Sequence, residues 1–337
     1  MIFEKQVIKM YKGMMYTRYD DTGIAYYFSS DDFAGLKKEP YTFTASAGHT
    51  LKGYLYHYDN SAPGRIVVFD HGIGGGHRSY MKEIEMLCRH GYPVFAYDHT
   101  GCMESGGENT GGMAQSLCDL NDCITAIKAN PCFSGVDISV IGHSWGGFSA
   151  LNISALHPDI SHIVVLSGFV SVQECINSFF PGILRVYRKA IMEIENSSNP
   201  YYVNFNAVKT LCESNAKVLL IYSDNDMKCR KTNFDILNSA LNSKDNIRFL
   251  LVSGKGHNPN YTSDAVNYLG SYIRELQTLT RQKRLVTPAQ KADFIASFDW
   301  DRMTAQDESV WQEIFACLTA SGDEEDPLSN NSGQLSE

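Results

Sequence analysis

The hexapeptide Gly142-His143-Ser144-Trp145-Gly146-Gly147 places a serine between glycines, after the apolar run Asp137–Ile141 and before a stretch of helical character. A Gly-x-Ser-x-Gly pattern alone recurs by chance, but between a strand and a helix it has a mechanical meaning. The chain must turn so sharply at the serine that only glycines avoid a clash beside it, and the turn lifts the serine oxygen above the sheet. The placement favours Ser144 as a nucleophile over the alternative, an ordinary glycine-rich loop.

Partners for such a serine follow later apolar runs. A serine hydroxyl needs a base within hydrogen-bond reach and a carboxylate that orients the base. Asp224 and Asp226 come directly after one run, and His257 follows the next. Because useful residues lie beyond the carboxyl ends of parallel strands, these groups should meet at one edge of the sheet. The sequence predicts a triad of Ser144, Asp226 and His257, with Asp224 as the alternative acid or as a brace of the turn.

Other histidines compete for the role of base. His143 is adjacent to the serine, so its side chain should diverge from the hydroxyl. His71, His77 and His99 lie near the same edge and stay open as supporting groups, while the remaining histidines fall in the early hairpin, on helix ends or on the opposite rim. His257 is therefore the preferred base.

Acyl transfer also needs hydrogen-bond donors for the developing oxyanion. The backbone N–H of Trp145 should be one, because amides at the start of a helix lack partners. The glycine-rich loop 70–76 should supply the other, because its glycines let the backbone approach a substrate. This loop does not meet the Gly-x-Gly-x-x-Gly fingerprint of dinucleotide sites, and no cofactor is expected.

The elements that must position these residues alternate between strand and helix from about residue 41, which predicts an α/β fold with a mostly parallel sheet and helices on both faces. An antiparallel hairpin should open the sheet, followed by strands buried on both faces. The predicted strands are 41–45, 51–58, 66–69, 94–97, 138–141, 163–166, 218–222 and 247–252.

Apolar residues at three- and four-residue spacing predict the helices between these strands. The predicted apolar stripes are Met81/Ile84/Leu87/Cys88, Leu117/Leu120/Ile124/Ile127, Phe234/Leu237/Leu241 and Val266/Leu269/Ile273/Leu276, the last closing a core that spans residues 41–279.

Two regions break the alternation. Residues 171–214 are longer than a crossover requires and rich in aromatic residues, which favours a lid or cap insertion. We expect Phe179, Phe180 and Tyr187 of this insertion to bind substrate. Residues 280–320 should form a helical extension packed on the core, with a partner-binding element as the alternative.

Helix-start signals in the extension are Thr287-Pro288 and a capping box from Thr304 to Asp307. Val310, Ile314 and Leu318 then form an apolar stripe. At the two ends of the chain we expect an N-terminal extension over residues 1–40 and an acidic, disordered tail over residues 321–337.

Composition narrows the class of protein. The 337 residues are 43% hydrophobic and 20% charged, and much of the net charge of −9 lies in the acidic tail. The sequence has no basic stripe of the kind that binds nucleic acid. Its apolar runs are all shorter than the ~20 residues that span a membrane. The nine cysteines are odd in number and scattered without metal-site spacing. These observations predict a cytoplasmic protein with reduced cysteines and no metal.

The sequence resembles the α/β-hydrolase superfamily, and more closely its serine-aminopeptidase-like and monoacylglycerol-lipase-like branch. The resemblance covers residues 41–279 and rests on the segments 71–74, 98–107, 142–147, 223–226 and 256–257. It implies the same triad, oxyanion amides from Ile73 and Trp145, and a lid at residues 171–214.

The expected activity is a serine hydrolase that cleaves a carboxylic ester of a neutral, apolar acyl group through a covalent acyl-enzyme. A small-molecule ester or amide is the expected partner. The alternatives within the fold are an aminopeptidase, an amidase or a thioesterase, since the fold does not name the substrate. The alternative of another class is a non-catalytic ligand-binding protein that keeps the pocket.

Overall fold

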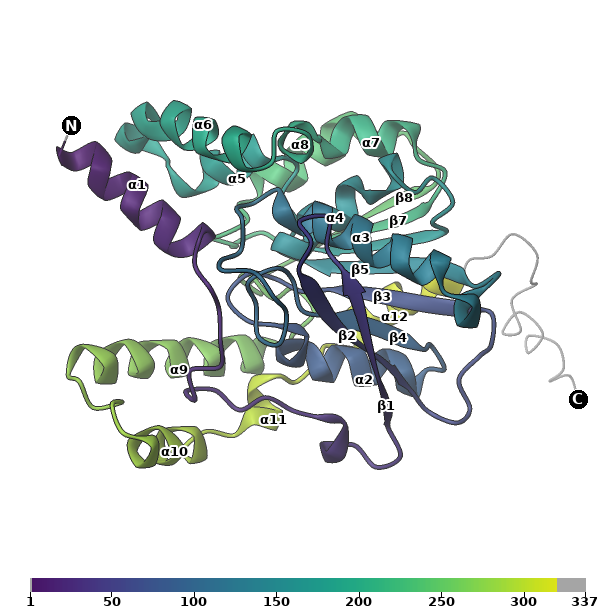
Figure 1. Cartoon of the computed structure of the whole chain (residues 1–337), viewed down its shortest axis with the longest axis horizontal. Coiled ribbons are helices and arrows are strands. Elements are labelled where there is room, and N and C mark those ends of the chain that lie inside the picture. Colours follow the sequence, from purple (N-terminus) through teal and green to yellow (C-terminus); the bar gives the residue numbers. More distant parts are fainter. Residues whose placement is uncertain (1, 320–337) are drawn as a thin grey trace, which may run out of the picture.

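A computed structural model describes residues 2–319 and centres on one eight-stranded sheet with the order β1-β2-β4-β3-β5-β6-β7-β8 (Figure 1). The strands are β1 (Lys37–Thr44), β2 (Thr50–His57), β3 (Arg65–Asp70), β4 (Val94–Tyr97), β5 (Asp137–His143), β6 (His162–Leu166), β7 (Lys217–Ser223) and β8 (Ile247–Val252). The predicted acidic tail, residues 321–337, lies outside the described residues.

The opening hairpin and the parallel order agree with the sequence pattern. β1 pairs with β2 and β2 with β4 in antiparallel fashion, and every other pairing is parallel. The predicted mostly parallel sheet is thereby confirmed. The strand order reverses direction at β3, so the carboxyl ends of β3 and β5 lie side by side at the place where open α/β sheets bind ligands.

The prediction for β8 is wrong in one respect. The strand has the predicted bounds, but it lies at the edge of the sheet and is not buried on both faces; Leu251 is 38% exposed. An edge strand has a neighbour on one side only, here β7, so its apolar residues are covered less completely. Arg248 on this edge forms an ion pair with Glu313, and such a charge discourages pairing with another strand.

Helices cover both faces of the sheet. One face packs against α3 (Gln115–Ala129), α4 (Trp145–Asn152), α7 (Ala207–Glu213) and α8 (Thr232–Leu241). The other face packs against α2 (Met81–Arg89) and α12 (Glu308–Thr319). Successive residues of β3 alternate between the two layers, with Val68 in the first and Val67 and Phe69 in the second.

The sequence analysis expected the core to close near residue 279. In the structure the core extends beyond this point. The helix α9 (Ser263–Arg281) leaves the sheet and packs with α10 (Pro288–Ala296) and α11 (Trp300–Met303) in a separate lobe (Figure 1). Two residues of the predicted stripe, Leu269 and Leu276, pack in this lobe, but Ile273 is 40% exposed and Tyr272 is buried in its place. The ring of Tyr272 contacts the rings of Phe294 on α10 and Trp300 on α11.

The last described helix, α12, returns to the sheet. Its residues Trp311, Ile314 and Leu318 are buried against β6 and β7. The helix does not start with the expected capping box, since Thr304 ends α11 and Asp307 accepts a hydrogen bond from the backbone N–H of Ser309 at 3.0 Å. The extension therefore completes the second layer of the fold.

The insertion predicted to be a lid, residues 171–214, and the N-terminal helix lie on the same side of the molecule (Figure 1). The insertion contributes α5 (Val172–Phe179) and α6 (Arg188–Ser198), whereas α7, its last helix, packs on α4 and α8. The helix α1 (Ile2–Met15) runs beside α6 on the same side of the molecule (Figure 1).

The packing of α12 predicts its contribution to stability. Replacing the fully buried Ile314 by alanine should lower the free energy of unfolding by about 2–4 kcal/mol, because the sheet cannot collapse into the space left. Urea denaturation followed by circular dichroism measures this change. Ile273→Ala on α9 is the matched control and should change stability by less than about 0.5 kcal/mol. Equal losses in the two variants would contradict the role given to α12.

Candidate active site

Ser144 occupies a strained turn between β5 and α4, with φ 57° and ψ −107°. The turn requires its glycines. A Cβ at Gly142 would lie 2.2 Å from the carbonyl oxygen of Gly146, and a Cβ at Gly146 would lie 2.1 Å from the carbonyl oxygen of Asp70. A positive φ is costly for a residue with a side chain and is found at functional positions. The turn places the Ser144 hydroxyl at the carboxyl edge of the sheet, where the buried side chain lines a cavity.

A chain of hydrogen bonds runs from this hydroxyl to a buried carboxylate. His257 Nε2 lies 2.8 Å from Ser144 Oγ, and His257 Nδ1 lies 2.7 Å from Asp226 Oδ2. The other oxygen, Asp226 Oδ1, accepts the backbone N–H groups of Lys228 at 2.7 Å and Cys229 at 3.0 Å. The carboxylate is thus fixed on both oxygens and orients the imidazole.

Asp224 lies elsewhere. Its carboxylate is exposed and accepts hydrogen bonds from Ser253 Oγ at 2.8 Å and from the backbone N–H of Gly254 at 2.9 Å. These bonds lower the pKa of Asp224. The residue therefore braces the two loops that carry Asp226 and His257, and it does not touch the imidazole.

Burial lowers the pKa of His257 below its ordinary value, and the hydrogen bond and charge of Asp226 oppose this shift. Desolvation disfavours the imidazolium, whereas a neighbouring carboxylate favours it. The net direction keeps the ring neutral at neutral pH, and a neutral ring can accept the proton of Ser144.

The peptide between Gly72 and Ile73 has a fixed orientation beside the serine. His71 Nδ1 donates to the carbonyl oxygen of Gly72 at 2.8 Å, and His71 Nε2 accepts the backbone N–H of His99 at 3.0 Å. Burial lowers the pKa of His71 to about 3, so the ring stays neutral. In a trans peptide the N–H points opposite to the C=O, so the N–H of Ile73 points away from His71. Trp145 supplies the first amide of α4.

Ile73 and Trp145 both line a cavity of about 390 Å³ in front of Ser144. The other lining residues are Met14, Met15, Gly72, Tyr80, Met113, His143, Phe169, Cys175, Phe179, Lys228, His257 and Asn258. This lining is mainly apolar, contains Lys228 and, among the described residues, includes no carboxylate. A second cavity of about 390 Å³ lies near Tyr201 and Phe205, but it holds no part of the Ser144–His257 pair.

The three aromatic residues predicted to bind substrate occupy different places. Phe179 lines the cavity. Phe180 is buried beside it and packs against Tyr11, with ring centroids 5.9 Å apart. Tyr187 packs against Phe3 of α1 at 5.9 Å. The structure therefore brings only Phe179 to the cavity, and the N-terminal helix covers the other two.

Sequence analysis missed three methionines of the cavity wall, Met14, Met15 and Met113. Met14 and Met15 belong to α1, which counted as an extension outside the core. Met113 lies in an irregular loop, where no periodic pattern marks burial. Its carbonyl oxygen accepts the indole N–H of Trp145 at 2.7 Å, and this bond holds the start of α4 against the loop.

A buried carboxylate joins α1 to the lid. Glu195 of α6 accepts the hydroxyls of Tyr11 at 2.7 Å and Tyr16 at 2.8 Å on Oε1, and the backbone N–H of Met113 at 2.8 Å on Oε2. Burial raises the pKa of Glu195. These three bonds connect the N-terminal segment, the lid and the cavity wall.

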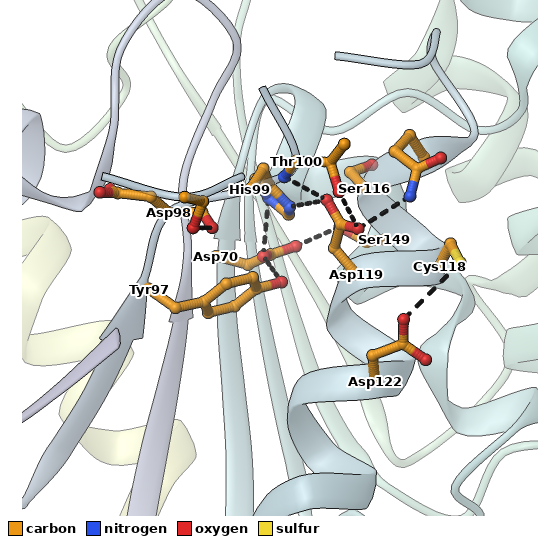
Figure 2. A network of polar contacts seen from close by, with 12 residues as sticks. Asp70, Tyr97, Asp98, His99, Thr100, Ser116, Cys118, Asp119, Asp122 and Ser149 are labelled. Carbon is orange, nitrogen blue, oxygen red and sulfur yellow. Dashed lines mark hydrogen bonds and ion pairs between the residues drawn. The ribbon is translucent and has the colours of Figure 1, made fainter. Parts of the chain in front are cut away.

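Beneath the serine, a buried polar network ties the sheet to its helices (Figure 2). His99 lies between two carboxylates, with Nε2 2.9 Å from Asp70 and Nδ1 3.2 Å from Asp119. These charges outweigh burial and raise the pKa of His99 to about 9. Asp70 also accepts the hydroxyl of Tyr97 at 2.7 Å and that of Ser149 on α4. Of the histidines left open as supporting groups, His71 and His99 therefore hold the floor of the site.

Three further features of the described chain bear on its class. No group of His, Cys, Asp and Glu residues within 2–319 has the arrangement of a metal site. All nine cysteines are unpaired. Within the same range, no helix has both the length and the apolar character needed to cross a bilayer.

Comparison with known proteins identifies the family of the chain. A family model described as serine aminopeptidase, S33, matches residues 61–250. The curated protein YqkD of Bacillus subtilis, which is uncharacterized, is 25% identical over 127 residues, or 38% of this chain and 41% of YqkD. The match thus spans less than half the length of that relative.

Solved structures share the architecture. The Pyrococcus furiosus esterase Pf2001 has a TM-score of 0.56 at 18% identity, covering 79% of this chain and 97% of the esterase. An α/β hydrolase from Vibrio vulnificus has a TM-score of 0.52 at 17% identity, covering 74% and 82% of the two chains. At these identities the similarity shows the α/β-hydrolase fold.

The lowered pKa of His257 predicts how Ser144 responds to pH. The rate of labelling by a fluorophosphonate should rise with pH as the imidazole loses its proton, with the midpoint below the unperturbed value of ~6.5. Asp226→Asn should slow labelling by roughly 10³- to 10⁴-fold, because the tautomer is no longer held. Asp224→Asn is the control and should slow it by less than about threefold. A midpoint above pH 7, or a larger loss in Asp224→Asn, would contradict the assignment.

Proposed function

Since the chain belongs to the serine aminopeptidase S33 family of α/β hydrolases, we propose that it is a serine hydrolase that cleaves carboxylic esters of neutral, apolar acyl groups. The family match confirms the superfamily and the branch predicted from the sequence. One observation carries the proposal: the hydrogen-bond chain Asp226–His257–Ser144 ends at a mainly apolar cavity.

In this mechanism His257 Nε2 takes the proton of Ser144 Oγ as the oxygen attacks the ester carbonyl carbon. The carbonyl oxygen becomes an oxyanion, and the amide N–H groups of Ile73 and Trp145 stabilise it. His257 then gives the proton to the leaving alkoxide, which departs as an alcohol and leaves an acyl-Ser144. A water molecule then attacks the acyl carbon while His257 takes one of its protons. The carboxylic acid leaves, and His257 returns the proton to Ser144 Oγ.

Asp226 acts during both halves of the reaction. Its carboxylate faces Nδ1 of His257 and stabilises the imidazolium that forms when Ser144 loses its proton. The backbone N–H groups of Lys228 and Cys229 hold its other oxygen, so the carboxylate cannot rotate away.

The chemistry of the cavity supports an ester over an aminopeptidase substrate. The protonated amino terminus of a peptide needs a carboxylate nearby, because an unpaired buried charge is costly. The described cavity lining has no Asp or Glu and places Lys228 at the site. A wall of Met14, Met15, Met113 and Phe179 instead suits an unbranched apolar chain, since methionine adapts to irregular apolar shapes.

A substrate panel tests this proposal. The protein should hydrolyse p-nitrophenyl esters of short- to medium-chain acids and leave aminoacyl-p-nitroanilides untouched. A fluorophosphonate should label it, and Ser144→Ala should lose both labelling and turnover. Turnover of the anilides without the esters would identify an aminopeptidase or amidase. Turnover of acyl thioesters alone would identify a thioesterase.

Binding of an acyl compound with neither labelling nor turnover would overturn the proposal in favour of a non-catalytic ligand-binding protein. Equal labelling of the wild type and Ser144→Ala would exclude Ser144 as the nucleophile.

The methionine wall predicts acyl-chain selectivity. Met14→Trp should fill part of the cavity and lower kcat/KM for an octanoate ester by at least about 10-fold, while an acetate ester should lose less than about threefold. Met10→Trp is the matched control, because this residue lies on the same helix and is 58% exposed outside the cavity. The ratio of kcat/KM for the two esters is the measurement. An unchanged ratio in Met14→Trp would show that the acyl chain does not lie against α1.

A further inference from the structure

We propose that Tyr80 is a positioning residue that couples the oxyanion loop to the loop of His257 through the side chain of His143. The inference rests on the serine-hydrolase function proposed above. It gives a role to the side chains of Tyr80 and His143, which take no part in the acyl-transfer steps.

The coupling is a continuous path of three hydrogen bonds. The backbone N–H of Gly72 donates to Tyr80 Oη at 3.0 Å. Tyr80 Oη lies 2.7 Å from His143 Nδ1, and His143 Nε2 lies 2.8 Å from the carbonyl oxygen of His257. The path therefore starts one residue before Ile73, passes beside Ser144 and ends on the backbone of the base.

Only one arrangement of protons satisfies every group on the path. The carbonyl oxygen of His257 can only accept, so His143 Nε2 carries the proton of a neutral ring. His143 Nδ1 is then an acceptor, and the hydroxyl of Tyr80 donates to it. The lone pairs of Tyr80 Oη remain free to receive the N–H of Gly72. Each donor has one acceptor, and the direction of every bond is fixed.

Burial keeps this arrangement intact across the working pH range. It lowers the pKa of His143 to about 3 and raises the pKa of Tyr80 above its ordinary value. Neither group changes its charge while His257 titrates, so the path holds geometry and does not move protons.

The packing around Gly72 shows how closely the hydroxyl is fitted. A Cβ on Gly72 would lie 2.6 Å from Tyr80 Oη and 3.3 Å from His143 Nδ1. Only glycine leaves room for the hydroxyl at this point. His71 holds the carbonyl of Gly72, as described above, and Tyr80 holds its N–H, so both sides of the residue before Ile73 are anchored.

This anchoring matters because the oxyanion forms only during the reaction. Donors fixed at the correct position before the reaction need no reorganisation in the transition state. Without Tyr80, the oxyanion loop and the base would be free to shift relative to each other, and a displacement of about 1 Å can cost about 100-fold in rate.

The test compares Tyr80→Phe with wild type. The variant keeps the ring and loses the hydroxyl. It should lower kcat on a p-nitrophenyl ester by roughly 10- to 100-fold, with KM within about threefold. Affinity for a trifluoromethyl ketone, which forms a tetrahedral adduct, should fall by a similar factor.

Tyr56→Phe is the matched control. Tyr56 Oη makes a comparable buried contact with His77 Nε2 at 2.9 Å, and neither residue is among those that line the Ser144 cavity. This variant should keep kcat within about threefold while losing similar thermal stability. Equal kcat in the two variants, or a rise in KM without a fall in kcat, would overturn the inference.

His143→Gln provides an independent variant, also where Tyr80→Phe does not fold. An amide N–H can still reach the carbonyl of His257, but the ring atom Nδ1, which accepts from Tyr80 in the wild type, is lost. If the path acts as one unit, the double variant should be no slower than the slower single variant. Losses that multiply would overturn the coupling. A wild-type protein without ester turnover or labelling would instead reject the proposed function, whatever the behaviour of Tyr80.

Discussion

The close approach of α4 to the ends of β3 and β5 is the constraint on which the site depends. Gly146 lies so near the carbonyl of Asp70 that no side chain fits between them, and Gly142 meets Gly146 in the same way. This contact accompanies the positive φ of Ser144, and Ser144 and Trp145 at the start of α4 both line the cavity. The proposed nucleophile and the proposed oxyanion donor thus depend on one packing interaction.

Such strain must be offset by the surroundings, and the network under α4 provides this support. His99 is held as a cation between Asp70 and Asp119, and Asp70 also receives a hydroxyl from α4. Removing one partner would leave a buried charge uncompensated, which costs far more than a surface ion pair contributes. The charges therefore hold β3, β4, α3 and α4 in the one arrangement that the turn at Ser144 requires.

Features that depend on local patterns of residues can be predicted from the sequence. Continuous apolar runs mark the parallel strands, and the order of Ser144, Asp226 and His257 follows from strand ends, which the fold brings to one edge. Predictions from local sequence patterns fail where contacts with residues distant in the sequence determine which side chains are buried. On α9, Tyr272 is buried against aromatic residues of α10 and α11 while Ile273 of the predicted stripe is exposed. The chain forms this lobe before α12 returns to cover the sheet, and Met14 reaches the cavity from α1. The hydroxyl of Tyr80 carries no signal in the sequence, because its partners are backbone atoms and a histidine 63 residues away.

The N-terminal helix α1 packs against α6 of the predicted lid and supplies Met14 and Met15 to the cavity wall. Tyr11 and Tyr16 donate to one oxygen of Glu195, so separating α1 from α6 would leave a buried carboxylate without these donors. A group left unsatisfied in this way costs more than the hydrogen bond itself contributes. Because Glu195 also holds the N–H of Met113, whose carbonyl fixes the indole of Trp145, the contacts connect α6, α1 and the start of α4. Under the function proposed above, substrate selection and stabilisation of the oxyanion consequently depend on the same set of contacts.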